Sequence, residues 1–183
     1  MGLRDRRANK RRERDQFGAG GSATTYQLKE RLVSFGDDYW IENQDGDRVL
    51  KVDGKMMRAR KTLDIEDPQG TKLCRIQTRV MHIRDTMVIE RPDGEEMAKV
   101  HKSLINPLRD HWKVDLAGGT QMEVHGNLID HEYDLEMDGR KLAEVSKKWF
   151  RVRDTYGVQV APEADTLVVL AAAVALDIMN HDE

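Results

Sequence analysis

A glycine-containing turn recurs along the chain at a nearly fixed interval, and this repeat limits the possible folds more than any other feature. Gly46, Gly70, Gly94 and Gly118 follow one another at intervals of 24 residues, and Gly139 comes 21 residues later. Each lies in a turn-forming segment such as Asp-Gly, Pro-Gln-Gly or Gly-Gly. Tight turns between antiparallel strands need residues that accept positive φ angles, which glycine does without strain. The repeat therefore predicts a series of β-hairpins.

Between the turns, apolar and polar residues alternate. The pattern is clear in Trp112–Leu116, Tyr133–Met137 and Tyr156–Val160. A period of two is typical of strands that bury one face. A leucine-rich repeat has a similar length, but the chain has no LxxLxL unit and no helix pattern after each strand. Five hairpins with their flanking strands give about a dozen antiparallel strands.

The C-terminal segment departs from this pattern. Pro162–Asp165 suits a helix start, and Leu167–Leu176 follows as an unbroken apolar run rich in alanine and leucine. We expect a helix over about residues 163–179. It has no polar stripe, so it must be buried on all sides. The interior of a closed barrel offers that environment, since barrels of more than about eight strands leave room inside. A packed sandwich with the helix over one end is the alternative.

The sequence therefore predicts a mainly β fold, a closed antiparallel barrel of about twelve strands around a central hydrophobic C-terminal helix. This domain is expected over residues 24–183. Residues 1–23 differ in composition: up to Ser22 they carry seven basic side chains against three acidic ones, and they end in the linker-like Gly18–Ser22. We expect a disordered basic tail, either solvated or attracted to an anionic surface.

Composition excludes several classes of protein. The formal net charge of −3 argues against a dedicated nucleic-acid binder. A lone cysteine, Cys74, excludes an intrachain disulfide and a cysteine zinc cluster, and its strand context suggests a buried apolar role. The longest apolar run has ten residues, whereas a membrane-spanning helix needs roughly 20. Without a secretory signal pattern, a cytoplasmic protein is expected, either free or peripheral to the membrane.

The chain also resembles the LURP-one-related family from Tyr26 to its end. The resemblance rests on the order and spacing of several short segments: Tyr26–Leu32 with Gly36–Asp38, Val52–Lys55, Asp130–Tyr133, Val145–Phe150, Asp154–Val158, Asp165, and Leu176–Asp177. It implies a tubby-like fold, a twelve-stranded barrel around a hydrophobic C-terminal helix. The family is similar to phospholipid scramblases and to tubby proteins, which bind phosphoinositides. No lipid-binding positions of tubby proteins can be matched residue by residue to this sequence.

Signs of catalysis or metal binding are few. The chain has no GxSxG, HExxH or phosphate-loop motif. His125 and His131 lie six residues apart beside acidic residues, but that spacing fits a hydrogen-bonded loop better than a metal site. Asp177 is an isolated acid in the apolar helix, four residues before His181, and it should find a partner near the barrel mouth because an uncompensated buried carboxylate is costly. We expect no enzymatic activity, no cofactor and no metal site.

Two basic clusters are candidate sites for lipid or another anion. Basic side chains beside aromatic or apolar ones can hold anionic headgroups or nucleic acid. Alternatively, the charges simply cover the outside of the barrel. The first cluster surrounds Trp149 and Phe150 and comprises Lys147, Lys148, Arg151 and Arg153. The second comprises Lys55, Arg58, Arg60 and Lys61.

Two functional hypotheses follow. The first is a non-enzymatic module that binds anionic phospholipid at the cytoplasmic membrane surface through these clusters and the tail. The second is a soluble interaction or scaffold protein of a stress or defence response, with a protein partner and no lipid ligand. Contact of the tail with DNA or RNA is a weaker third, and specific nucleic-acid binding is not expected. Scrambling is disfavoured because the chain has no membrane-spanning segment.

Overall fold

A computed structural model of the chain describes residues 23–29, 39–57, 60–80, 85–103, 112–150 and 155–181. The predicted basic tail therefore lies outside the described residues, except for Ala23. The strands are β1 (Thr24–Lys29), β2 (Tyr39–Asn43), β3 (Arg48–Met57), β4 (Arg60–Glu66), β5 (Lys72–Val80), β6 (Asp85–Glu90), β7 (Glu96–Lys102), β8 (Trp112–Leu116), β9 (Gln121–Asn127), β10 (Glu132–Met137), β11 (Arg140–Ser146) and β12 (Thr155–Val160). The short 3-10 helix η1 (Lys147–Trp149) follows β11, and the helix α2 (Thr166–His181) follows β12.

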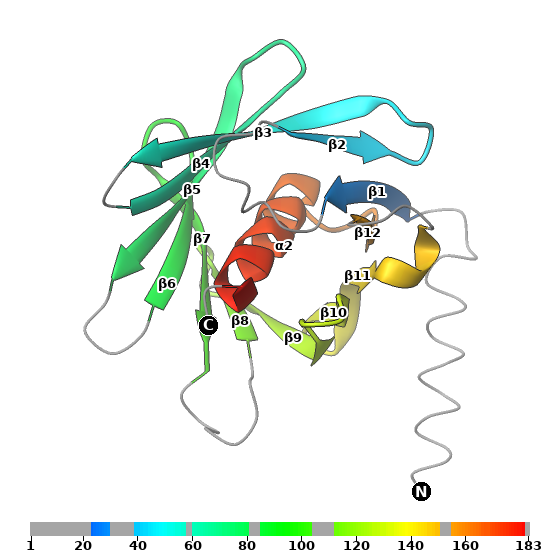
Figure 1. The fold of residues 1–183 in the computed structure, drawn as a ribbon. Helices are drawn as coiled ribbons and strands as arrows, with labels where there is room; N and C mark the ends of the chain where they lie inside the picture. Colours follow the sequence, from blue (N-terminus) through cyan, green and yellow to red (C-terminus); the bar gives the residue numbers. More distant parts are fainter. Residues whose placement is uncertain are drawn as a thin grey trace, which may run out of the picture.

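The strands close into a single antiparallel barrel (Figure 1). Each strand pairs with its neighbours in chain order, and β1 completes the ring by pairing with both β2 and β12. The closing register places Thr24 opposite Val160 and Lys29 opposite Thr155. The predicted barrel of about twelve strands is thus confirmed, and the alternative of a packed sandwich is excluded.

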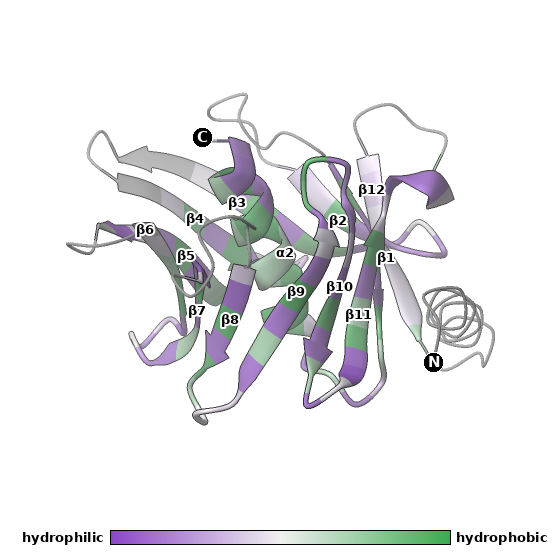
Figure 2. Cartoon of the chain, turned by 90° about the horizontal axis from the view of Figure 1, so that it is seen from below, coloured by the Kyte–Doolittle hydropathy of each residue, from purple (hydrophilic) through white to green (hydrophobic). Residues whose placement is uncertain are grey.

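Helix α2 runs through the ring of strands and forms the centre of the core (Figures 1 and 2). Every residue from Val168 to Met179 is buried. The helix contacts β6, β7 and β12, among other strands, and the inward-facing apolar side chains of the barrel pack around it. A helix without a polar stripe is stable here because the inner face of the sheet surrounds it.

The helix begins later than expected from the sequence. Pro162–Asp165 form a turn, in which the Ala164 N–H donates to the Ala161 carbonyl oxygen at 3.1 Å. Asp165 caps the helix, because its Oδ1 accepts a hydrogen bond from the Val168 N–H at 3.2 Å. Thr166 is the first helical residue, and the helix continues to His181 rather than ending near residue 179.

The two ends of the barrel differ in how the strands are connected. At the end we call the turn end, short hairpin turns join the strands, and α2 begins there. At the other end, which we call the loop end, segments of eight or nine residues make three of the six connections. Helix α2 ends there (Figure 2). The strand residues at the turn end are Thr24, Asn43, Arg48, Glu66, Lys72, Glu90, Glu96, Leu116, Gln121, Met137, Arg140 and Val160. Those at the loop end are Lys29, Tyr39, Met57, Arg60, Val80, Asp85, Lys102, Trp112, Asn127, Glu132, Ser146 and Thr155.

The same hydrogen-bond pattern recurs in turns of the turn end. In the β2–β3 turn the Asn43 side-chain oxygen accepts hydrogen bonds from the N–H groups of Asp45 and Asp47. In the β4–β5 turn Asp67 accepts equivalent bonds from residues 69 and 71. Each predicted turn contains a glycine with a positive φ, and in the Gly118–Gly119 turn this residue is Gly119. The turn end is therefore encoded by local sequence.

Candidate functional site

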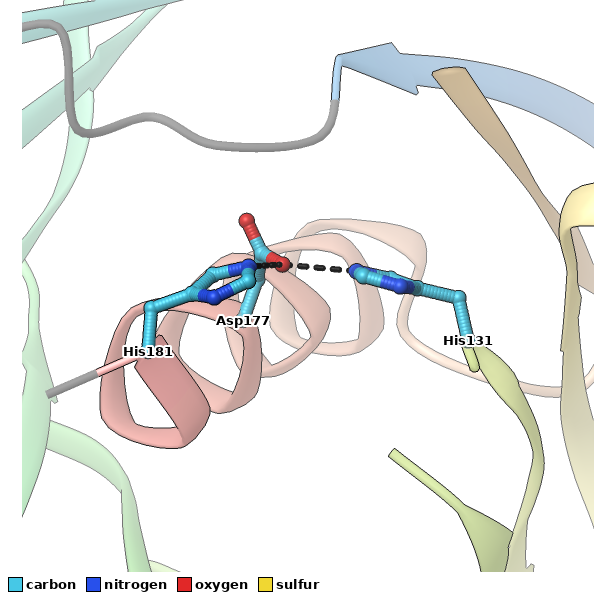
Figure 3. A group of neighbouring side chains, drawn as sticks. All are labelled: His131, Asp177 and His181. Carbon is cyan, nitrogen blue, oxygen red and sulfur yellow. Dashed lines mark hydrogen bonds and ion pairs between the residues drawn. The ribbon is translucent and has the colours of Figure 1, made fainter. Parts of the chain in front are cut away.

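A buried carboxylate lies near the C-terminal end of the core helix. The Asp177 side chain is only 1% exposed, and the ten residues before it, Leu167–Leu176, are apolar. Burying a charged group in such a setting is costly unless a partner compensates the charge. Two imidazoles provide that partner, those of His131 and His181 (Figure 3). The sequence-based expectation that Asp177 would have a partner near the barrel mouth is confirmed.

His131 reaches Asp177 from the connection between β9 and β10. Its Nε2 lies 2.6 Å from Asp177 Oδ1, and its side chain is as fully buried as the carboxylate. The turn before it is held by Asn127, whose side-chain amide exchanges hydrogen bonds with Asp130. His131 itself has a φ of 49°, in the left-handed region that non-glycine residues seldom occupy. The fold therefore holds a strained residue in place in order to bring this imidazole into the core.

His181 approaches the same carboxylate oxygen from the last turn of α2. Its Nε2 lies 3.3 Å from Asp177 Oδ1, as expected for residues four apart on one helix face. Its side chain is 27% exposed, so this side of the cluster faces the solvent at the loop end. The ligand atoms of the three residues all lie within 4.8 Å of one another. We refer to His131, Asp177 and His181 as the His-Asp-His cluster.

Tyrosine side chains surround the cluster on the barrel wall. Burial, followed by the charge of Asp177, raises the pKa of Tyr39 well above its ordinary value. The same two causes raise the pKa of Tyr133. The ring of Tyr156 packs on the imidazole of His131, with centroids 4.5 Å apart. The phenols of Tyr39 and Tyr133 therefore stay neutral at physiological pH.

His125 does not join the cluster. It projects from the outer face of β9, where its Nε2 lies 3.3 Å from a Glu123 oxygen and 3.7 Å from a Glu136 oxygen. The two histidines considered together from their sequence spacing are therefore separated by the barrel wall. The expectation that the chain has no metal site stays a prediction. What the sequence spacing missed is that the fold brings His131 to Asp177, 46 residues away.

The first basic cluster lies at the loop end, next to β12. Lys147 and Lys148 belong to η1, which Ser146 caps by accepting a hydrogen bond from the Lys148 N–H. The Lys148 side chain is 77% exposed, and its Nζ lies 2.9 Å from Glu132 Oε2. Trp149 follows, with 38% of its surface exposed. The other two predicted members, Arg151 and Arg153, lie outside the described residues.

The second basic cluster lies at the same end, on another part of the rim. The backbone pairing places Lys55 opposite Thr62 and Lys61 opposite Met56, with Arg60 at the first position of β4. Arg58 lies outside the described residues, and the side chains of Lys55, Arg60 and Lys61 are likewise not described. The strands β1 and β2 separate the two clusters along the rim. The described members of the two predicted clusters thus lie at one end of the barrel, on separate parts of its rim.

The turn end has the opposite character. Its turns, residues 44–47, 67–71, 91–95, 117–120, 138–139 and 161–165, carry eight carboxylates against a single arginine. Next to them on the outer wall is a hollow of about 180 Å³. Its charges are paired, because the buried Asp64 binds Arg75 at 2.8 Å and Lys72 at 2.7 Å. Cys74 also lines this hollow, and burial raises the pKa of its thiol to about 12.

Comparison with known proteins identifies the family. A sequence model of the LURP-one-related family matches residues 24–177, which is the whole barrel and the helix as far as Asp177. The chain belongs to the LURP-one-related family. This LURP-one-related protein is 26% identical over 156 residues to the uncharacterized protein YxjI of Bacillus subtilis, covering 85% of this chain and 93% of YxjI.

The fold is also that of a solved plant protein. The X-ray structure of a protein from Arabidopsis thaliana superposes with a TM-score of 0.62 and 16% sequence identity, covering 86% of this chain and 91% of the other. At that identity the likeness establishes the fold alone. Among the described residues, no helix is both long enough and apolar enough to pass through a bilayer.

Proposed function

We propose that this LURP-one-related protein is a non-enzymatic module that binds anionic phospholipid at the cytoplasmic membrane surface with its loop end. The observation that carries the proposal concerns exposed apolar side chains. Among the described residues, the exposed large hydrophobic side chains are Ile129, 73% exposed, and Trp149, 38% exposed. Both lie at the loop end, and Trp149 directly follows Lys147 and Lys148.

This combination suits a membrane surface. Tryptophan is favoured at the boundary between headgroups and acyl chains because its ring has an apolar body and a polar N–H. Each lysine or arginine near an anionic leaflet contributes about 1 kcal/mol of attraction. Ile129 lies on the β9–β10 connection and Lys148 contacts Glu132 of β10, so the apolar and basic groups occupy neighbouring parts of the rim.

The charge difference between the two ends gives the module an orientation. An anionic leaflet would repel the eight carboxylates in the turns of the turn end. It would attract the basic residues of both clusters, whose described members lie near the loop end. The core helix supports a non-enzymatic role, because it occupies the interior where larger barrels hold a ligand cavity.

The test is co-sedimentation with vesicles at about 0.1 M salt, where the Debye length is about 10 Å. Anionic phosphatidylserine-containing vesicles are compared with neutral phosphatidylcholine vesicles for the full chain and for a version that starts at Thr24. A loop-end variant carries Lys147→Ser and Lys148→Ser. A matched turn-end variant carries Arg91→Ser and Arg140→Ser, which change the net charge equally. Loss of two basic contacts should weaken binding to anionic vesicles about 30-fold.

The proposal predicts that the loop-end variant loses this affinity while the turn-end variant keeps it. Binding that disappears when residues 1–23 are removed would assign the attraction to the basic tail and contradict a role for the barrel. Absence of binding by every version would overturn the lipid proposal. A protein partner, as in a scaffold of a stress or defence response, would then be the hypothesis to pursue.

A further inference from the structure

The His-Asp-His cluster contains more than a hydrogen-bonded pair needs. One imidazole would suffice to compensate a buried carboxylate, yet two converge on the same oxygen, Oδ1 of Asp177, at 2.6 and 3.3 Å. Among the described residues, these imidazoles are the ion-pair partners of Asp177, and no lysine or arginine takes that place. The other aspartate oxygen, Oδ2, is buried and has no hydrogen-bond partner in the described part of the chain.

The unpartnered Oδ2 is an independent observation, because it shows that the two imidazoles do not satisfy the whole of the buried carboxylate. Buried polar atoms in folded proteins are nearly always satisfied, because leaving one without a partner costs free energy. The side chain that carries it is 1% exposed and lies between the two imidazoles (Figure 3). In addition, His131 keeps its left-handed backbone conformation at the point where it enters the cluster. Backbone strain of this kind gathers at sites that bind ligands or ions.

The spacing of the donor atoms fits a metal ion. Zinc binds imidazole nitrogen and carboxylate oxygen at about 2.0–2.1 Å in tetrahedral geometry, which places neighbouring ligand atoms about 3.3 Å apart. Of the two separations from Asp177 Oδ1, the one to His181 Nε2 matches that value at 3.3 Å and the one to His131 Nε2 is shorter at 2.6 Å, and all three ligand atoms lie within 4.8 Å of one another. A small rotation of His131 away from the carboxylate would bring its Nε2 to the same spacing and open the centre for an ion.

The donor types indicate which ions fit. Two imidazoles and one carboxylate suit divalent first-row transition ions, whereas Ca²⁺ and Mg²⁺ prefer sites built from oxygen alone. Three protein ligands leave one coordination position open, as in zinc sites that also bind water or another ligand. His181 is 27% exposed, so this open position has access from the solvent at the loop end.

We propose that His131, Asp177 and His181 form a binding site for a divalent transition-metal ion, with Zn²⁺ as the representative ion. The ion would join the end of the core helix to the β9–β10 connection. This proposal does not depend on lipid binding, and the two are tested by separate measurements.

The experiment uses the full chain without a histidine tag, stripped with EDTA and desalted. Zn²⁺ uptake is measured by calorimetric titration and by elemental analysis after dialysis, with Mg²⁺ and Ca²⁺ as comparison ions. We expect one Zn²⁺ per chain and no uptake of Mg²⁺ or Ca²⁺. Co²⁺ serves as a spectroscopic probe, because the intensity of its visible absorption reports four-coordinate binding. Zn²⁺ should also raise the midpoint of thermal unfolding.

Variants locate the site. His181→Ala removes a partly exposed ligand at the helix end and should leave the core folded. His131→Gln and Asp177→Asn remove the buried ligands. Each should weaken Zn²⁺ binding by about 100-fold or more, since even indirect supporting partners of a metal ligand account for 10–100-fold. The matched control is His125→Ala, which removes an imidazole that also lies beside two carboxylates but on the outer wall.

The outcomes separate clearly. Stoichiometric uptake that is lost in His181→Ala and kept in His125→Ala supports the site, even if a buried variant fails to fold. No uptake by the unmodified chain would overturn the proposal and leave a buried carboxylate that contacts two imidazoles. Uptake that persists in His181→Ala, or that depends on His125, would also overturn it and assign the metal to another place.

Discussion

The two ends of the barrel use glycine for different reasons. At the turn end, the glycines with positive φ, such as Gly70 and Gly94, have open space where a side chain would begin. At the loop end, Gly126 and Gly157 have none: a Cβ on Gly126 would lie 2.3 Å from the Glu132 carbonyl oxygen, and one on Gly157 would lie 2.5 Å from Trp149 Cε3. Conformation alone therefore limits these positions at the turn end, whereas at the loop end space limits both positions, and conformation limits Gly126 as well.

This difference follows from how each end is encoded. The turn end is built from contacts between residues at most a few positions apart, such as Asn43 with the backbone of Asp47. The loop end is built from contacts between distant segments, such as Lys148 with Glu132 and His131 with Asp177. The same local hydrogen-bond pattern can recur in several turns, whereas each contact between distant segments occurs at one place in the fold. The proposed binding sites of this protein both lie at the loop end.

The largest expected contrast comes from Gly126→Ala against Gly70→Ala. At Gly126 the new Cβ would meet backbone atoms, and the φ of 137° is one that only glycine adopts easily. We expect the free energy of unfolding to fall by about 3–4 kcal/mol for Gly126→Ala and by about 1 kcal/mol for Gly70→Ala. Urea denaturation followed by circular dichroism measures both. Equal losses would show that space is not what distinguishes the two ends.

Gly157→Ala is expected to have the next largest effect. Its Cβ would push against the rings of Trp149 and Phe150, which cover this position of β12, so the end of η1 must move. We expect a loss of about 2 kcal/mol in unfolding free energy and a shift in tryptophan emission. The control is Gly54→Ala, where the Cβ would lie an ordinary 3.5 Å from a Leu63 methyl group. A loss for Gly54→Ala as large as that for Gly157→Ala would show that the lack of space beside the two rings is not the cause.

Asp64 provides a pH-dependent test on the outer wall beside the turn end. Burial raises the pKa of its carboxyl, but the hydrogen bonds from Arg75 and Lys72 outweigh this and lower the pKa below 3.8. The ionised form is therefore favoured in the folded state. Its stabilisation is fully present above about pH 4 and is lost as the pH falls through the lowered pKa.

We expect Asp64→Asn to reduce the unfolding free energy by about 1.5 kcal/mol at neutral pH and by progressively less below about pH 4. Urea denaturation across this pH range checks the trend. Glu95→Gln is the control, because Glu95 is exposed and its 3.3 Å contact with Arg91 is a surface ion pair. A deficit of Asp64→Asn that stays constant with pH would rule out the charge as its cause.

The smallest effect is expected in a turn cap. Asn43→Ala removes the oxygen that accepts two backbone hydrogen bonds in the β2–β3 turn, and we expect a loss of about 1 kcal/mol. Asn43→Asp keeps an acceptor in the same place and should stay within about 0.5 kcal/mol of the unmodified chain. Thermal unfolding resolves the two. A loss equal to that of Gly126→Ala would mean that the turn end depends on tertiary contacts after all.

Much of the fold could be predicted because its signals are local. The glycine spacing and the alternation around Trp112 and Tyr156 specify hairpins within short windows of sequence. The helix was recognisable from its uniform hydrophobicity, which requires burial on every side. Its first residue was less certain, because the cap at Asp165 depends on the turn that precedes it. The Gly118–Gly119 pair specifies a turn, but the sequence alone does not say which of the two takes the positive φ that the structure gives to Gly119.

The candidate site was only partly accessible from sequence. Asp177 was conspicuous as an acid in an apolar helix, and its neighbour His181 lies at helical spacing. Nothing local pointed to His131 as the second partner, because barrel closure brings it there. The shared location of the two basic clusters was deducible from counting strands: segments separated by an even number of antiparallel strands return to the same end. The positions of Arg151 and Arg153 stay a prediction.

The core helix follows the twelve described strands in the sequence, and this order affects how the protein folds. Strand β1 can complete its pairing only when β12 exists, and the inner wall has no core until α2 follows. Bringing such distant segments together costs chain entropy before their contacts stabilise the fold. This cost slows folding. During synthesis the hairpins would emerge with their apolar faces uncovered. We therefore expect this chain to rely on chaperones until helix α2 is released, and to aggregate when α2 is removed.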